Sequence, residues 1–167
     1  VTGELTDHYN PTDNTIYLSD SVYDKSTAAA VGVAAHEAGH AVQHAVGYTP
    51  MKVRSAIIPA TRIASNLAMP LILLGIVLSF EPLAMIGVIA FGLSTLFQLV
   101  TLPVEFDASG RALKALEQGG LSSEDTAEAK KVLKAAALTY VAALAVSLAN
   151  LLRLFLIVSG NSGKRRK

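Results

Sequence analysis

Three long segments without a charged residue constrain the fold of this chain more than any other feature. They are 18, 23 and 18 residues long. A hydrocarbon core about 30 Å thick requires about 20 helical residues, with a working range of about 17 to 25. Apolar neighbours extend the two shorter segments into that range. The sequence therefore predicts three membrane spans, at about 63–80, 82–104 and 135–158.

The composition favours a membrane protein over a soluble one. Hydrophobic residues make up 51% of the 167 residues, charged residues only 16%, and the mean hydropathy is +0.44. The alternative is that the three segments are buried helices of a soluble core, but one small chain cannot easily shield them. We expect a mainly α, multi-pass helical protein of the cell membrane, with the lipid bilayer as a partner. The formal net charge of +1 and the lack of a basic stripe argue against binding to nucleic acid.

The remaining regions divide the single predicted domain. Residues 1–25 combine turn formers with a β-type run and predict a short strand or hairpin. Ser26 or Thr27 caps a helix predicted over 26–46, which ends at Gly47. Residues 105–134 are charged and alanine-rich, and they predict two further helices, the second of them amphipathic and capped by Ser122 or Ser123. Residues 160–167 form a basic tail. Residue 1 is valine, so we expect a truncated N-terminus.

The segment AAHEAGHAVQH, residues 34–44, points to a metal centre. Residues i and i+4 of a helix lie on one face, so His36 and His40 can direct their imidazoles at one ion. Glu37 then lies beside the ion, where it can accept a proton from water. This HExxH arrangement is typical of zincin-type active-site helices in zinc proteases. With no cysteine in the chain, every protein ligand must be histidine or a carboxylate.

His44 and His8 are weaker candidates. His44 lies on the same helical face as the pair but about 12 Å along the axis from His36, too far to share a tetrahedral ion. We expect His44 to lie at the surface or to support a ligand. We expect His8 to be structural or to contact substrate.

A catalytic zinc has three protein ligands and one open position, so a third ligand must come from elsewhere in the chain. Glu105 is the best candidate because two spans joined by the tight turn at residues 79–82 return the chain to the side on which it left. Pro103 just before it suggests that Glu105 lies at the start of a new helix. The alternative is a carboxylate favoured there only by the helix dipole. Asp107 should pair with Arg111, and Ser109 is placed to touch a ligand histidine.

At this point the chain resembles a known family. A histidine helix followed by a membrane hairpin and a helix-borne glutamate is similar to the HtpX-type membrane metallopeptidases. The segments LTDHYNP, IYLS, AAHEAGHAVQHA, RSAIIP and LPVEFDASGRAL resemble the YugP-like neutral zinc metallopeptidases more closely. The resemblance covers nearly the whole chain. It implies His36, His40 and Glu105 as zinc ligands and Glu37 as the catalytic base. Ser109 stands where the HtpX-type pattern has an aspartate.

The predicted function is a membrane-bound, zinc-dependent endopeptidase that acts on peptide or protein substrates. Glu37 would be the general base that takes a proton from a zinc-activated water. We expect the substrate to pair in extended form with the edge of a strand at residues 15–18. The alternatives are a non-catalytic scaffold of the same fold and, less favoured, a metal carrier, which would require ionisable groups within the spans.

The membrane orientation is inferred from basic residues, which concentrate on cytoplasmic loops. The opposite side has the KRRK tail and Arg153. The balance favours a cytoplasmic active site. The basic residues expected on the side of the site are Lys52, Arg54, Arg62, Arg111, Lys114, Lys130, Lys131 and Lys134.

Overall fold

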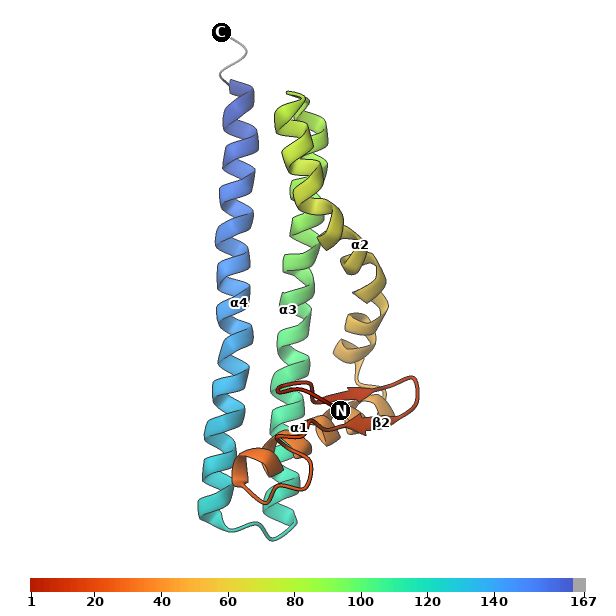
Figure 1. The fold of residues 1–167 in the computed structure, drawn as a ribbon, viewed down its shortest axis with the longest axis vertical. Helices are drawn as coiled ribbons and strands as arrows, with labels where there is room; N and C mark the ends of the chain where they lie inside the picture. Colours follow the sequence, from red (N-terminus) through yellow and green to blue (C-terminus); the bar gives the residue numbers. More distant parts are fainter. Residues whose placement is uncertain (164–167) are drawn as a thin grey trace. The chain divides into compact units, whose positions relative to one another are not determined.

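The computed structural model describes residues 1–163, and within that range it contains four helices and a two-stranded sheet (Figure 1). The protein is mainly helical, as the sequence predicts. The basic residues 164–167 lie outside the described range. In chain order the elements are β1 (His8–Asn10), β2 (Thr15–Tyr17), α1 (Ala28–Ala45), α2 (Thr49–Val77), α3 (Glu81–Gln118) and α4 (Ser123–Gly163).

The N-terminal sheet is an antiparallel hairpin with Tyr9 opposite Ile16. Asn14 supports the turn because it adopts a positive φ of 55°, a conformation that asparagine tolerates better than most residues. Both strands contact α1. The short predicted strand is therefore one arm of a two-stranded hairpin that lies against the histidine helix.

The ends of α1 follow local capping rules. The side chain of Thr27 accepts a hydrogen bond from the backbone N–H of Ala30 and so satisfies one of the free donors at the helix start. After the C-cap residue Val46, Gly47 has a φ of +65°, which glycine adopts without steric cost. Thr27 is one of the two predicted caps, and the break at Gly47 is where the sequence suggested it.

Two predicted boundaries inside the helices were wrong. Pro103 does not begin a new helix, because α3 continues through it from Glu81 to Gln118. Proline removes one backbone donor, a loss that long apolar helices tolerate. The predicted amphipathic helix and the third span are likewise one helix, α4, which runs on to Gly163 and takes in the start of the predicted tail. Ser122 accepts a hydrogen bond from the N–H of Asp125 and caps α4.

The chain forms two compact units. Unit 1 comprises Val1–Lys52 and Leu102–Thr139, and unit 2 comprises Val53–Thr101 and Tyr140–Lys167. Unit 1 holds the hairpin, α1 and the parts of α3 and α4 on either side of the α3–α4 turn. Unit 2 holds most of α2 and the remaining parts of α3 and α4. All candidate site residues therefore belong to unit 1.

Small residues bring α2 and α3 close together in unit 2. A side chain at Gly87 would collide with Ile72, and one at Gly75 would collide with Ala84. Ile72 and Ala84 also belong to the buried apolar cluster of this unit, together with Val88. Close backbone approach at small residues is the usual way in which helices pack in a membrane.

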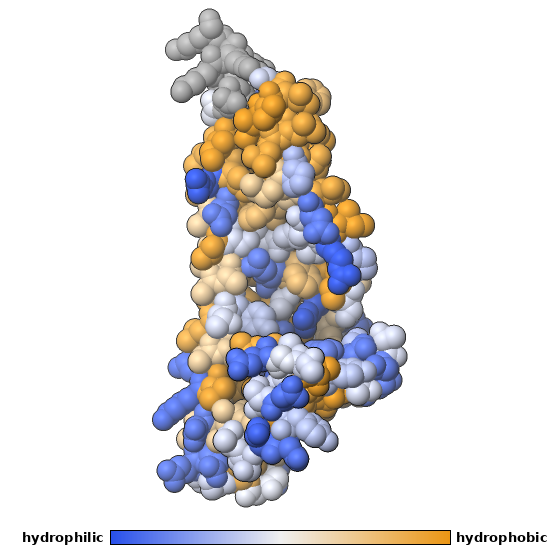
Figure 2. All heavy atoms as spheres, viewed as in Figure 1, coloured by the Kyte–Doolittle hydropathy of each residue, from blue (hydrophilic) through white to orange (hydrophobic). Residues whose placement is uncertain are grey.

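Among the described residues, three helices are long and apolar enough to cross a membrane, judged by length and composition: α2, α3 and α4. In the 18-residue apolar stretch that identifies each helix as a candidate span, only 22%, 22% and 11% of the residues, respectively, are buried within the structure. Most of this apolar surface therefore needs an apolar environment outside the protein. On the face shown in Figure 2, hydrophobic residues cover unit 2 around the α2–α3 turn, whereas hydrophilic residues are frequent on unit 1.

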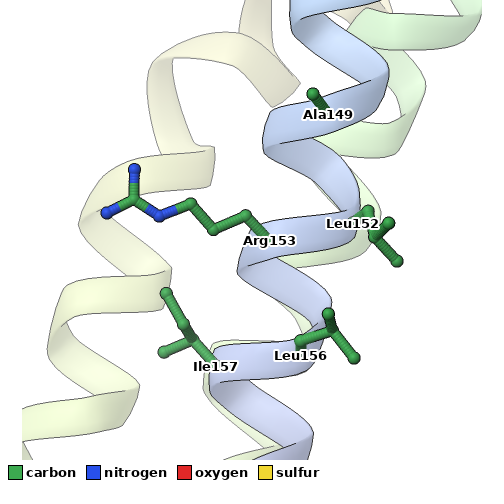
Figure 3. Close-up of a pocket in the computed structure, with 5 residues that line it drawn as sticks. All are labelled: Ala149, Leu152, Arg153, Leu156 and Ile157. Atoms are coloured by element: carbon green, nitrogen blue, oxygen red, sulfur yellow. The ribbon is translucent and has the colours of Figure 1, made fainter.

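One charged side chain interrupts the apolar surface of α4. Arg153 extends from the helix on the same side as Ile157, and both residues line a shallow pocket together with Leu156 (Figure 3). An arginine near the end of a span can lay its aliphatic stem along apolar surface and extend its charged group toward the membrane interface. Arg153 is therefore compatible with a membrane-embedded α4.

Candidate metal centre

Two histidines on α1 and one glutamate on α3 come together in unit 1. His36 and His40 are four residues apart, and their ring centroids are 4.7 Å apart. The Oε2 atom of Glu105 lies 3.2 Å from His36 Nε2 and 3.6 Å from His40 Nε2. One potential ligand atom from each residue lies within 4.8 Å of the others. The structure thus brings together the three residues that the sequence suggested as ligands, and their role as ligands stays a prediction.

This donor set suits zinc. Bonds of about 2.0 to 2.2 Å from a tetrahedral zinc to nitrogen and oxygen place neighbouring ligand atoms about 3.3 Å apart. The two distances from Glu105 to the histidines, 3.2 Å and 3.6 Å, bracket that value. Two imidazoles and one carboxylate also leave one of four positions open, as a catalytic zinc requires.

Gly39 allows α1 and α3 to approach closely enough to form this group. A Cβ atom at residue 39 would lie 2.5 Å from the backbone oxygen of Ala108, closer than such contacts occur. Glu105 is one turn before Ala108 on α3, and only 2% of its surface is exposed. The sequence indicated that the small residues after Glu37 permit a close neighbour, and here the neighbour is α3.

Glu37 is buried next to the two histidines, with 8% of its surface exposed. Burial raises the pKa of Glu37 above its ordinary value, while positive charge on His40 and His36 and a backbone hydrogen bond from Tyr9 act in the opposite direction. The shift makes Glu37 a stronger base than an exposed glutamate. Because Tyr9 is in β1, the hydrogen bond also shows that β1 lies beside this carboxyl group.

His40 is affected by two opposing influences. Burial lowers its pKa, but the hydrogen bond and negative charge of Glu105 raise it, and the net direction is upward. The upward direction of the His40 pKa means that the carboxylate of Glu105 favours a positively charged partner at this position. A metal cation would satisfy the same preference.

The second nitrogen of each histidine also has a partner. His36 Nδ1 lies 3.1 Å from Ser109 Oγ, and His40 Nδ1 lies 3.0 Å from Gln43 Oε1. The contact predicted for Ser109 is confirmed. Ser109 thus presents a hydroxyl group at the position where the HtpX-type pattern has an aspartate.

The other predicted residues lie outside the group of three. His44 is exposed, and its Nδ1 atom lies 2.7 Å from the hydroxyl of Tyr9. His8 stacks on the ring of Tyr17, with centroids 5.0 Å apart. Asp107 accepts a hydrogen bond from Arg111 Nε at 2.6 Å, so the predicted pairing is confirmed.

Sequence reasoning missed Gln43. Its side chain is fully buried and lies between His40 and Asp107: the amide oxygen faces His40 Nδ1, and the NH₂ group donates a hydrogen bond to Asp107. The available signal was its position three residues after His40, which puts both on one face of α1.

Comparison with known proteins identifies the family of the chain. Residues 1–159 match the family described as "Putative neutral zinc metallopeptidase". The chain belongs to this family. It is 45% identical over 158 residues to "Putative membrane protease YugP" of Bacillus subtilis (strain 168), an alignment that covers 94% of this chain and 70% of that protein. No solved structure matches the chain. The resemblance to YugP-like proteins is confirmed, and membership of the family implies zinc.

Proposed function

We propose that this protein is a membrane-bound, zinc-dependent endopeptidase with a zincin-type HExxH helix. The observation that carries the proposal is the convergence of His36, His40 and Glu105 next to the buried Glu37. Membership of a zinc metallopeptidase family supports the same reading. His36, His40 and Glu105 would hold the metal, and Glu37 would be the catalytic base.

Bound zinc would supply a Lewis acid that polarises the peptide carbonyl and makes water acidic enough to react near neutral pH. The remaining work falls to Glu37. Its carboxylate would take the proton from the attacking water and then give it to the leaving amine, because an acid–base group must serve in both directions. Burial supports this role, since a raised pKa strengthens the carboxylate as a base. No covalent intermediate with the protein is needed.

The substrate would be a peptide or protein segment that binds in extended form along the hairpin. Backbone pairing with the edge of a sheet is a recurring way to present a peptide to a cleft. The sequence suggested the strand at residues 15–18 for this contact. The hydrogen bond from Tyr9 to Glu37 supports β1 instead, because it brings that strand next to the proposed base.

We further propose that α2, α3 and α4 each cross the bilayer, with the metal centre on the cytoplasmic side. Their length and apolar composition support spanning. The number of basic residues near the ends of the spans on the side of the site supports this orientation.

The proposal is tested by metal content and peptide hydrolysis of the detergent-purified chain. We expect about one zinc per wild-type chain, and loss of both zinc and hydrolysis in His40→Ala and Glu105→Ala. Glu37→Gln should keep zinc but lose at least about a hundredfold in hydrolysis, in line with the contribution of a general base. If the Glu37→Gln variant still hydrolyses peptides at the wild-type rate, Glu37 is not the catalytic base. If the wild-type protein binds no zinc, the proposal is wrong and the alternative of a non-catalytic scaffold with the same fold is favoured.

A further inference from the structure

A buried amide connects His40 to an ion pair on α3. Gln43 Oε1 lies 3.0 Å from His40 Nδ1. At its other end, Gln43 Nε2 donates to the backbone oxygen of Val104 and to Asp107 Oδ2, both at 2.8 Å. The same Asp107 oxygen accepts a hydrogen bond from Arg111 Nε at 2.6 Å. All these atoms lie in unit 1, and Gln43 has no exposed surface.

This network fixes the orientation of the Gln43 amide. A backbone carbonyl and an ionised carboxylate only accept hydrogen bonds, so the NH₂ group must face Val104 and Asp107. The amide oxygen then has to face His40, and because it can only accept, the Nδ1 atom of His40 must carry a proton. In a neutral imidazole this leaves the lone pair on Nε2. Nε2 is the His40 atom that lies 3.6 Å from Glu105.

His36 lacks an equivalent restraint. Its Nδ1 atom faces the hydroxyl of Ser109, at 3.1 Å. A hydroxyl both donates and accepts, so it is compatible with either tautomer of the ring. The two histidines therefore differ: the partner of His36 is adaptable, whereas the partner of His40 is held in place by two acceptors on α3, Val104 O and Asp107 Oδ2.

We propose that Gln43 and Asp107 are positioning residues that keep His40 in the tautomer and orientation required of a zinc ligand. This inference rests on the proposed function, because it takes His40 to bind the metal. Histidine ligands commonly donate their second N–H to a carboxylate or carbonyl, and loss of that partner typically weakens metal binding about 10–100-fold. Here the amide of Gln43 contacts His40 directly, and the carboxylate of Asp107 accepts a hydrogen bond from that amide.

The test measures the zinc dissociation constant of the full chain in detergent by competition with a chromogenic chelator. Gln43→Met keeps the approximate volume of the side chain but removes its hydrogen bonds. We expect zinc to bind about 10–100-fold more weakly. Ser19→Ala is the matched control, because Ser19 is also fully buried and hydrogen-bonded, to Asp7 and not to a ligand candidate. It should lower the melting temperature without changing zinc affinity.

A second route covers the case in which Gln43→Met does not fold. Gln43→Glu keeps an oxygen that can accept a hydrogen bond from His40, but it places the new carboxylate against the carboxylate of Asp107. When Gln43→Glu is combined with Asp107→Asn, the amide of residue 107 can donate a hydrogen bond to the carboxylate of residue 43. We expect the double variant to bind zinc more tightly than Gln43→Glu alone. Equal or weaker binding by the double variant would contradict the proposal.

The protonation of the rings gives a readout independent of activity. The chain has four histidines, so ¹⁵N spectra of histidine-labelled, zinc-loaded protein are simple to assign by single substitution. We expect His40 to carry its proton on Nδ1, and the opposite tautomer would overturn the proposal. Zinc affinities of Gln43→Met and wild type within about twofold would also overturn it while leaving the proposed function intact. Failure of the wild type to bind zinc would instead remove the proposed function itself.

Discussion

A single glycine sets the distance between the two helices that carry the candidate ligands. Gly39 lies between His36 and His40 on α1, and its missing side chain leaves room for the backbone of Ala108. A carbonyl of a helix backbone cannot move aside as the end of a flexible side chain can. Even the smallest side chain at this position would therefore force α1 and α3 apart.

We expect Gly39→Ala to lower the free energy of unfolding by about 1–3 kcal/mol, the usual cost of overpacking, despite the better helix propensity of alanine. Gly110→Ala is the matched control, since a Cβ atom there would meet nothing within 4 Å. It should be neutral or stabilising by up to about 1 kcal/mol. Denaturant unfolding of unit 1, followed in detergent, compares the two. Equal effects of both substitutions would show that the contact with Ala108 is not limiting.

At the scale of elements, the candidate centre joins α1 to α3. Two candidate ligands lie on α1 and the third lies on α3, and the hydrogen bonds of Ser109 and Gln43 cross between the same two helices. A metal held by both helices binds the folded arrangement and not the unfolded chain. Its binding free energy therefore adds to the stability of unit 1.

Removal of zinc by a chelator should loosen α1 from α3. At a free zinc concentration about 1,000 times the dissociation constant, the bound ion contributes about 4 kcal/mol. We expect faster amide hydrogen exchange in residues 28–45 and 105–118 after removal, and little change in residues 63–77. In the Glu105→Ala variant, the amide hydrogens of the same residues should exchange at equal rates with and without zinc. Unchanged exchange in the wild type would argue against a metal that bridges the two helices.

At the scale of the whole molecule, the apolar segments determine the environment in which the chain folds. Most of the apolar windows of α2, α3 and α4 are not covered by other parts of the protein. In water this exposure would be costly, because apolar surface carries about 25 cal/mol per Å². A bilayer removes that cost.

Because the chain has no cysteine, single cysteines can report this topology. We expect a membrane-impermeant maleimide to label Ser122→Cys in inside-out vesicles and Glu81→Cys in intact cells. Both residues are exposed; Glu81 is the first residue of α3, and Ser122 directly precedes α4. Labelling of both from one side would exclude the proposed crossing of the bilayer by α3, and the reverse pattern would place the candidate metal centre outside the cell.

The sequence predicted features that depend on local pattern. The spacing of His36 and His40 puts them on one helical face whatever surrounds the helix, and uncharged runs of membrane length predict spans by composition alone. Glu105 required one step more, an argument about where a returning chain arrives. Helix boundaries were less predictable, since Pro103 is accommodated inside α3 and the start of α4 merges with the third apolar segment.

The sequence by itself determined the class of the protein, its candidate donor groups and the place of the helix that carries two of them, because these follow from residue types and periodicity. Only the tertiary structure decided which groups contact the candidate ligands. Gln43, Val104 and Asp107 meet because α1 packs on α3 at Gly39. Residues more than 60 positions apart in a chain have no local pattern that relates them. Their contact depends on how closely two helices pack, and packing is a property of the folded chain.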